Sequence, residues 1–542
     1  MGFMLLAGAL PLFINHDWEW DFLNYHFYDG YAFLHHRLTL DYAPAKFWTF
    51  FNPLLDTLNY LIISRLNQHP ALILCLLGAM NGIPFFIFFK LCCLIINKDY
   101  PYQKLYIALA FLLGITAARV LGQVGSLQND LPTTAMTLLG VYFGFKALNP
   151  FHENISGLAN TREKRTAPLW LIFFSGLATG AAVGLKLTNT PYALSLGIAI
   201  FFCGHQKKRI PLSFFFGFGI TLGFLVLNGF WMWALKTHFH SPLFPYYNTF
   251  FRSPDYAFVN IRDHRYILEN IFQVFTYPFD YLKENSLSTT SPMRDWRLGA
   301  WLILSLCYGA KIYFLKSQKL STTEPENPNF TLKFLLIYTW SAYFIWINVF
   351  DIYRYAEPLQ LISGLCLILC YDRLFLTQNS NKIWSTAFRI LLVLLTALIL
   401  KETIYSRFSL DFFSKKPTPN STQEFITLQP PTGLSDTSLI VITGDKQSFV
   451  APFFPPSVIF ASTEIWGGFP NPLGIQAIKK HQGPLYLLFG SDPNYEAQLP
   501  QDNFLLLNHL RFELNKQKCQ TLKTNQSLQQ EVYLCPAKLS KP

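Results

Sequence analysis

Charged residues are scarce in this sequence. Asp, Glu, Lys and Arg make up 14% of its 542 residues, whereas soluble domains carry about 25%. Apolar residues make up 51%, and long runs with almost no charge recur through the first four hundred residues. Runs of about 20 apolar residues can cross the hydrocarbon core of a bilayer. The composition therefore excludes an ordinary soluble enzyme and predicts an all-α polytopic membrane bundle.

Several other signatures are missing as well. The sequence contains no CxxC or HExxH pattern of the kind that holds a metal, and its C-terminal region lacks the GxGxxG and GxxxxGK[ST] patterns of nucleotide binding. The formal net charge is +11, but no basic helix with interleaved aromatic residues is present. These absences exclude nucleic acid as a partner. The basic residues instead gather in short polar gaps between the apolar runs.

The N-terminus lacks a basic segment and a small-residue cleavage site, so it is not predicted to be a removed signal peptide. Its apolar run, Phe3–Ile14, is short for a membrane span. Either the helix extends into the following loop or the native N-terminus lies further upstream. Ten more apolar runs follow, which gives about eleven transmembrane helices. They lie near residues 73–96, 105–123, 131–148, 168–185, 190–203, 211–235, 299–316, 334–350, 357–371 and 386–401.

The basic residues assign the polar gaps to the two sides of the membrane. Lys and Arg are concentrated in alternate gaps, which predicts that these gaps are cytoplasmic. The basic gaps lie near residues 98–104, 146–165, 207–209, 311–319 and 373–382. An odd number of spans then places the N-terminus in the cytoplasm and the C-terminus outside. The sequence thus predicts an integral protein of the bacterial inner membrane.

The first extracytoplasmic loop, residues 15–70, is unusually rich in ionisable and aromatic side chains. Aromatic residues at a membrane surface are often plain anchors, but a connecting loop does not need its carboxylates. We therefore expect this loop to be catalytic. Its candidate residues are the carboxylates Asp17, Glu19, Asp21 and Asp41, together with His26, which is equally consistent with a structural role.

The other unusual polar residues fall on the same predicted side. Asp130, Lys186 and Arg354 each follow or precede an apolar run, and the long loop 236–298 carries two RDxR strings. Arginine forks match phosphate oxygens in geometry. Surface ion pairs of snorkelling arginines are the alternative explanation. The predicted phosphate-binding candidates in these strings are Arg262, Arg265, Arg294 and Arg297.

Residues 1–402 are predicted to form the membrane domain, and residues 403–542 a small extracytoplasmic α/β domain. Short β-rich runs lie at residues 438–443, 457–461 and 484–489, with helix-like stretches near 472–481 and 503–516. Cys519 and Cys535 are the two cysteines of this polar region, so an extracytoplasmic location makes them disulfide candidates. The domain is expected to act as a lid or to recognise an acceptor.

An acidic first loop, cationic residues on the same face and a C-terminal extracytoplasmic domain together resemble the type C (GT-C) membrane glycosyltransferases. The chain is more closely similar to a group of bacterial membrane proteins that share six of its strings. These are DFLNYHFYDGYAF from Asp21, NPLLD from Asn52, GLKLT from Gly184, PLFPYYN from Pro242 and the two RDxR strings. No Trp-Trp-Asp string of the oligosaccharyltransferase kind is present, which argues against transfer to protein asparagine.

The resemblance implies an inverting hexosyltransferase with a polyprenyl-phosphate sugar as donor and a glycan, lipid or protein as acceptor. It also implies that a carboxylate soon after the first span is the base, and Asp21 is the first candidate. Asp41 would assist it or, with Asp21, hold a divalent cation such as Mg²⁺ or Mn²⁺. The alternative function is a transporter, flippase or ligase of lipid-linked sugars, although transporters tend to place charges near the membrane midplane in repeated halves.

Overall fold

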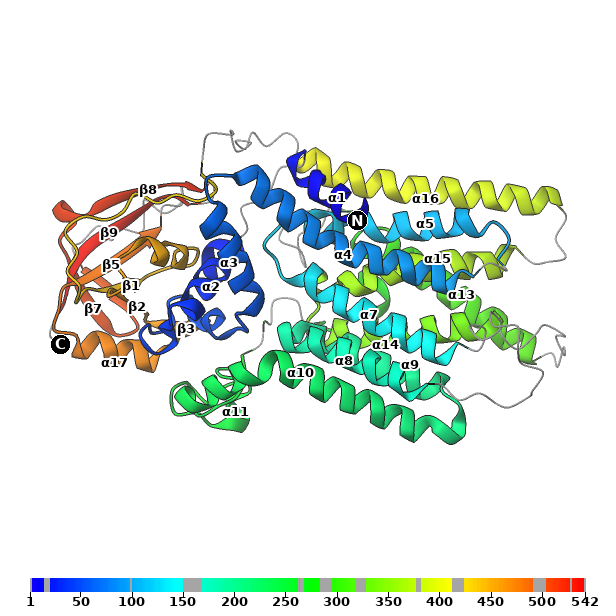
Figure 1. Ribbon diagram of the computed structural model, residues 1–542, viewed down its shortest axis with the longest axis horizontal. Coiled ribbons are helices and arrows are strands. Elements are labelled where there is room, and N and C mark those ends of the chain that lie inside the picture. The colour runs from blue at the N-terminus through cyan, green and yellow to red at the C-terminus, as the bar shows by residue number, and fades with distance from the viewer. Residues whose placement is uncertain are drawn as a thin grey trace.

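A helical bundle and a C-terminal sheet domain lie end to end along the long axis of the computed structural model (Figure 1). The structure describes residues 2–13, 20–97, 100–149, 168–261, 263, 268–282, 294–317, 328–376, 382–411, 424–490, 504–526 and 529–540.

Each of the ten apolar runs after the first loop falls on helical structure. The helices are α4 (Pro70–Ile95), α5 (Gln103–Ile115) with α6 (Ala118–Gly122), α7 (Asp130–Leu148), α8 (Leu169–Leu185), α9 (Thr190–Cys203), α10 (Arg209–Phe239), α13 (Arg297–Ser317), α14 (Pro328–Val349), α15 (Glu357–Phe375) and α16 (Lys382–Asp411). Five helical segments of the described residues are long and apolar enough to cross a bilayer. The chain is thus an integral membrane protein, and the number of eleven spans stays a prediction.

Small residues allow the closest helix contacts in the bundle. Gly176 and Gly180 of α8 lie against the backbone of α10, and Gly219 and Gly223 of α10 lie against the backbone of α8. A Cβ atom at any of these four positions would overlap a backbone oxygen of the other helix. Paired glycines four residues apart bring membrane helices together in this way because they remove the side chains that would separate the backbones.

The first apolar run forms a short helix, α1 (Gly2–Ala9), followed by the 3₁₀ turn η1 (Leu10–Leu12). Eleven helical residues rise about 17 Å, which is roughly half of the hydrocarbon thickness. The run packs along α4, where Gly78 lies against the Ala7 carbonyl and Gly82 against Met4. The described part of this run is therefore a half-length helix attached to α4.

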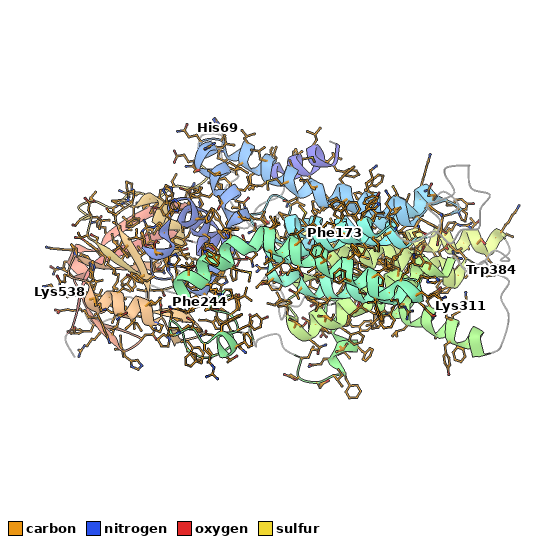
Figure 2. The ribbon with its side chains drawn as sticks, turned by 60° about the horizontal axis from the view of Figure 1, so that its bottom comes forward. His69, Phe173, Phe244, Lys311, Trp384 and Lys538 are labelled. Atoms are coloured by element: carbon orange, nitrogen blue, oxygen red, sulfur yellow. A yellow bond between two sulfur atoms is a disulfide. The ribbon has the colours of Figure 1, made fainter. Side chains whose placement is uncertain are left out.

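The first loop folds into helices at the end of the bundle that faces the sheet domain. It contains a π-helical turn η2 (Phe22–His26), α2 (Phe27–Leu34), η3 (Arg37–Thr39), η4 (Lys46–Phe50) and α3 (Leu54–Leu66). Figure 2 shows Lys311 and Trp384 at the opposite end of the molecule from Lys538. The second long loop contributes α11 (Asn248–Phe251) and α12 (Gln273–Asp280).

The C-terminal domain is built on a mixed seven-stranded sheet, ordered β2-β1-β5-β9-β7-β6 with β8 paired to β9. Strands β2 (Ile459–Ser462), β1 (Leu439–Ile442) and β5 (Leu485–Gly490) are parallel. Antiparallel pairing joins β5 to β9 and β9 to β7 and β8. The remaining elements are η9 (Ser448–Phe453), α17 (Pro472–Lys480), β6 (Phe504–Leu507), β7 (Leu510–Leu514), β8 (Gln520–Gln526), β9 (Gln529–Leu539) and the hairpin of β3 (Glu464–Trp466) and β4 (Phe469–Pro470).

One predicted element of this domain is wrong. The helix expected near residues 503–516 is the hairpin β6–β7, and its second strand alternates between buried and exposed side chains. The two residues between the strands, Asn508 and His509, both have positive φ angles. Such a backbone matches the twist of a two-residue hairpin turn. The short Leu-rich run offered too little length to distinguish the two periodicities.

The boundary predicted at residue 402 falls inside α16, which continues to Asp411. The described part of the C-terminal domain begins at Glu424. Within this domain Cys519 and Cys535 form a disulfide that joins β9 to the end of η11 (Lys516–Lys518).

Candidate active site

Asp21 lies at the start of the π-helical turn that opens the first loop. The Phe27 N–H donates to the Phe22 carbonyl, which widens this turn to five residues. Asp21 and His26 are also five residues apart, so they lie one π turn from each other on the same side. Asp21 is 6% exposed and His26 is 3% exposed. The π turn thus directs two buried ionisable side chains into the end of the bundle.

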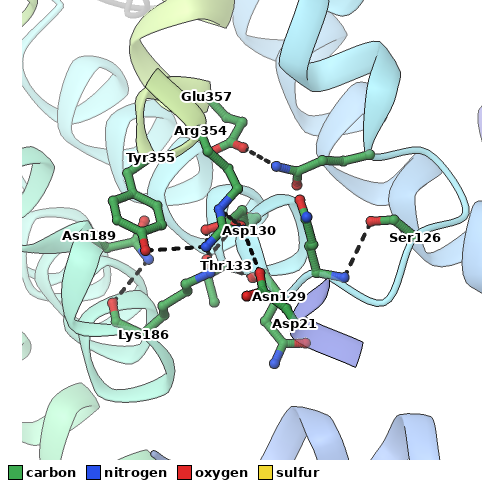
Figure 3. Close-up of polar contacts among 12 residues, drawn as sticks. Asp21, Ser126, Asn129, Asp130, Thr133, Lys186, Asn189, Arg354, Tyr355 and Glu357 are labelled. Atoms are coloured by element: carbon green, nitrogen blue, oxygen red, sulfur yellow. Dashed lines mark hydrogen bonds and ion pairs between the residues drawn. The ribbon is translucent and has the colours of Figure 1, made fainter. Parts of the chain in front are cut away.

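Arg354 reaches Asp21 from a part of the chain more than three hundred residues away (Figure 3). Its Nη1 donates to Asp21 Oδ2, and its Nε lies 3.7 Å from Asp130 Oδ2. Lys186 Nζ donates to the other oxygen of Asp130. Two carboxylates and two cations therefore form one cluster, which we call the Asp21 cluster: Asp21, Asp130, Lys186 and Arg354.

Breaks between helices place the cations of this cluster. Lys186 occupies the extended residue between α8 and the 3₁₀ turn η6 (Leu187–Asn189), as the polar interruption of residues 186–191 predicts. Arg354 lies in the 3₁₀ turn η8 (Tyr353–Ala356) before α15, and Asp130 is the first residue of α7. A carboxylate at a helix N-terminus is favoured by the helix dipole. Non-helical backbone at membrane depth is tolerated where protein surrounds it or a cavity adjoins it.

Tyr355 connects the two cations. Its ring centroid lies 5.1 Å from the Arg354 guanidinium carbon and 5.4 Å from Lys186 Nζ. Its hydroxyl accepts a hydrogen bond from Arg354 Nη2 at 3.2 Å, and its carbonyl accepts one from the Tyr192 hydroxyl at 2.6 Å. The ring therefore holds both positive charges close together, despite their mutual repulsion, through its negative faces. The sequence predicted Arg354 as a site residue, whereas Tyr355 had no predicted role.

The charges of the cluster determine the ionisation of Asp21. Burial alone would raise the pKa of Asp21, but Arg354, His26 and Lys186 together outweigh it and hold that pKa below its ordinary value. Asp21 is therefore ionised at neutral pH. As long as Arg354 remains bound to it, it is a weaker base than a free carboxylate.

A second buried group adjoins the first through His26. Its Nδ1 lies 2.6 Å from Asp56 Oδ1, and Asn129 Nδ2 donates to the same oxygen at 2.7 Å. Burial lowers the pKa of His26, but its contact with Asp56 outweighs burial and raises it. His26 Nε2 is buried and has no hydrogen-bond partner in the described part of the chain. Asp56 was not among the predicted site residues, although it ends the NPLLD string.

Asp41 belongs to a separate group of buried contacts, centred on Arg37. Both of its oxygens bind Arg37, at 2.6 and 2.7 Å, and they also accept from the Tyr28 hydroxyl and the Phe460 N–H. Arg37 in turn donates to the carbonyls of Pro456 and Val458 in the C-terminal domain. None of these residues binds Asp21. In these contacts Asp41 and Arg37 attach the C-terminal domain, and an assisting or cation-binding role of Asp41 beside Asp21 stays a prediction.

The arginines of the second RDxR string are also separate from the Asp21 cluster. Arg297 is fully buried, and it donates to Asp295, Thr403, Thr116 and the Leu113 carbonyl. Arg294 contacts Glu402 at 3.3 Å. These contacts join α13 to α16 and to the α5–α6 region, and the phosphate-binding role of Arg294 and Arg297 stays a prediction. Asp17, Glu19, Arg262 and Arg265 lie outside the described residues.

Metal ligands do not gather here in the part of the chain that the structure describes. No group of three or more His, Cys, Asp or Glu side chains could hold an ion within those residues. A divalent cation at Asp21 and Asp41 stays a prediction. Glu357 is another carboxylate nearby, and it accepts a hydrogen bond from Gln123.

Comparison with known proteins adds a likeness in fold. No protein-family model and no curated protein sequence matches the chain. Among solved structures, the chain is similar to ArnT from Cupriavidus metallidurans bound to undecaprenyl phosphate, with 12% sequence identity and a TM-score of 0.47. The apo state of the same protein gives a TM-score of 0.48 at 12% identity. Both matches cover 98% of this chain and 96% of the other.

Proposed function

We propose that this chain is a membrane glycosyltransferase that moves a sugar from a polyprenyl-phosphate donor to an extracytoplasmic acceptor. The observation that carries the proposal is the Asp21 cluster. A buried, ionised carboxylate from the first loop is held there by Arg354, and a second cation, Lys186, lies beside it. One base and two phosphate-binding cations thus meet at the end of an apolar bundle.

Each part of the reaction has a matching group. The acceptor oxygen attacks the anomeric carbon while the bond from that carbon to the phosphate oxygen breaks, and the electron pair leaves with the lipid phosphate. Arg354 and Lys186 stabilise the negative charge that develops on the phosphate. Asp21 accepts the proton of the acceptor hydroxyl. The apolar helices surround the prenyl chain. Attack opposite the leaving phosphate inverts the anomeric centre.

Donor binding would also activate the base. The four charges of the Asp21 cluster sum to zero in the absence of donor, since Asp21 and Asp130 balance Arg354 and Lys186. A donor phosphate would compete with the carboxylates for the Arg354 fork. Each contact that Asp21 loses to the phosphate raises its pKa and therefore its basicity. The ion pair would in this way keep Asp21 unreactive until donor is bound.

The test is donor turnover by purified protein. A radiolabelled polyprenyl-phosphate sugar is incubated with the protein in lipid nanodiscs and a membrane extract as acceptor, and free lipid phosphate is measured. We expect turnover in the wild type and in D436N, an exposed control, but not in D21N. A transporter would leave the donor unchanged in all three proteins, and this result would overturn the proposal.

We further propose that the chain lies in the bacterial inner membrane with its N-terminus in the cytoplasm and its sheet domain outside. The alternating basic gaps support this orientation. A periplasm-dependent reporter fused after Pro542 should be active. Activity of a cytoplasm-dependent reporter at the same position would place the Asp21 cluster on the wrong side for this reaction.

A further inference from the structure

Three tryptophans from separate segments meet beside the Asp21 helix. Trp48 belongs to η4, Trp466 to β3 of the C-terminal domain, and Trp20 immediately precedes Asp21. The ring of Trp48 lies 4.9 Å from that of Trp20 and 5.4 Å from that of Trp466, edge to face in both cases. All three side chains are partly exposed. The junction between the first loop and the C-terminal domain thus presents a continuous aromatic surface.

Ionic groups border this surface. Lys46 Nζ lies 2.8 Å from Asp445 and 3.4 Å from Glu464, and the three side chains are 15%, 40% and 29% exposed. Lys46 is two residues from Trp48, and Glu464 is two residues from Trp466 on the same face of β3. Glu464 and Trp466 therefore share one face of the strand, and Lys46 joins that strand to η4 through its contact with Glu464. We call the set Trp20, Lys46, Trp48, Asp445, Glu464 and Trp466 the aromatic platform.

The backbone around the platform is held in an uncommon conformation. Lys46 has a φ angle of 55° and Lys446 a φ angle of 60°, both in the left-handed region. Non-glycine residues in this region carry strain, which is found preferentially at ligand sites. On the other side, the Gly467–Gly468 turn of the β3–β4 hairpin has positive φ at both residues, and Gly468 N donates to Glu464. The hairpin therefore holds Glu464 and Trp466 in place.

A membrane anchor does not explain this arrangement. Trp170, Trp233 and Trp384 lie on the apolar helices and are 59–72% exposed, as lipid-facing residues are. Trp466 instead comes from the sheet domain, and its strand lies beside the first-loop helices (Figure 1). A purely apolar junction would also have no need of exposed ion pairs. Aromatic faces bordered by a few polar groups are typical of small-ligand sites.

We propose that the aromatic platform binds a saccharide, the sugar unit of the acceptor. A pyranose ring has C–H bonds on one face, which pack against the negative face of an indole, and hydroxyls at its rim, which hydrogen-bond carboxylates and ammonium groups. The platform connects to the base through the chain, because Trp20 adjoins Asp21 and the Tyr25 ring is stacked parallel to Trp48 at 6.2 Å. This inference rests on the proposed function, and it selects a carbohydrate acceptor over a protein.

Saturation-transfer NMR tests the platform without knowledge of the acceptor. The probes are the methyl glycosides of glucose, galactose, mannose and N-acetylglucosamine, added to the full chain in nanodiscs. We expect saturation of ring protons in at least one glycoside, with a severalfold loss in W48A and in W466A. W48F should retain the signal, because it keeps an aromatic face, and W170A and W233A are matched controls. The proposal would be overturned if no glycoside gave a signal with the wild type, or if W48A and W466A gave the same signal as the wild type.

Further arms identify the source of the sugar and separate this proposal from the first. An octyl glycoside that binds at least tenfold more tightly than its methyl counterpart indicates a glycolipid acceptor, and equal binding indicates a free glycan. Saturation transfer to an unstructured Ser/Thr-rich peptide but to no glycoside would show a polypeptide site and contradict the proposal. R354K and D21N should bind the glycosides normally. Glycoside binding without any donor turnover would reject the glycosyltransferase and leave the saccharide site standing.

Discussion

Two buried Arg–Asp pairs of this molecule have opposite surroundings. In the Arg37–Asp41 pair, both carboxylate oxygens have several donors, and the arginine also binds two carbonyls of the C-terminal domain. In the Arg354–Asp21 pair, Arg354 Nε and Asp130 Oδ2 face each other at 3.7 Å, and neither atom has a hydrogen-bond partner among the described residues. The first pair is complete in the protein alone, and the second leaves buried polar atoms unsatisfied.

This difference separates structural from functional charges. A buried polar atom without a partner costs about 1–3 kcal/mol, so such atoms persist where a ligand completes them or where function requires them. Arg297 belongs with the complete pairs, because the described contacts of its guanidinium use protein acceptors on every side. The same residue types in similar short strings therefore have different roles, and their unused donors distinguish them.

The largest effect is expected for D21N, which keeps the shape of the side chain and removes its charge. Donor turnover should fall by roughly 10²-fold or more if Asp21 is the general base. Folding and donor binding should be nearly intact. The measurement is single-turnover release of lipid phosphate, with D436N as control. Full activity in D21N would mean that the two Arg–Asp pairs do not differ in the proposed way.

D41N is the converse change, made in the complete pair. It leaves the buried Arg37 without its counter-charge, and such a loss typically costs about 3–5 kcal/mol of stability. We expect a lower temperature of thermal unfolding for the purified protein, while the molecules that remain folded keep their turnover. A variant that is as stable as the wild type but inactive would return Asp41 to the active site.

R354K tests the fork geometry of the incomplete pair. Lysine keeps the positive charge but cannot offer two parallel donors. Loss of one charge-assisted hydrogen bond is worth about 1.5–3 kcal/mol, so the donor KM should rise at least about tenfold. R294K is the matched control, since Arg294 lies outside the Asp21 cluster. An equal rise of the donor KM in R354K and R294K would contradict the special role of Arg354.

The pH dependence of the donor kcat/KM should report the ion pair directly, because this ratio reflects the protein before donor binds. The pKa of Asp21 lies below its ordinary value, about 3.9 in model peptides, because Arg354 leads the charges that outweigh burial. Activity that needs the carboxylate should therefore persist as pH falls and decline only through that lowered pKa. In R354M, the main charge that lowers the pKa of Asp21 is gone, so burial raises this pKa. The acidic limb of the pH profile should then move to higher pH. An unchanged acidic limb would show that Asp21 is not the titrating base.

The smallest effect is expected for D29N, in a carboxyl group that has no hydrogen-bond partner among the described residues. Burial, followed by the charge of Asp56, raises the pKa of Asp29 well above its ordinary value. The folded state then binds a proton that the unfolded state releases, so stability should fall as pH rises between the two pKa values. D29N should remove this slope with little effect on turnover. The measurement is the unfolding temperature of the wild type and of D29N at pH 5 and at pH 8. The same change between the two pH values in both proteins would contradict the prediction.

Local sequence features were sufficient for much of the fold. The ten apolar runs after the first loop all fall on helical structure, because burial in lipid requires long uncharged segments. The polar break at Lys186 and the strands β1, β2 and β5 were also located, since turn residues and β-rich runs act over a few residues. The β6–β7 hairpin was missed because it depends on two residues with positive φ rather than on composition.

The sequence by itself determined which ionisable residues were unusual for a membrane protein, and among them Asp21, Asp130, Lys186 and Arg354 are brought together. Only the tertiary structure decided which partners each one has. Asp21 and Asp41 lie in the same loop, yet one binds Arg354 and the other binds Arg37. The physical reason is range: hydrophobic patterning places segments locally, whereas the state of a buried charge depends on atoms within a few ångströms, contributed by residues hundreds of positions away.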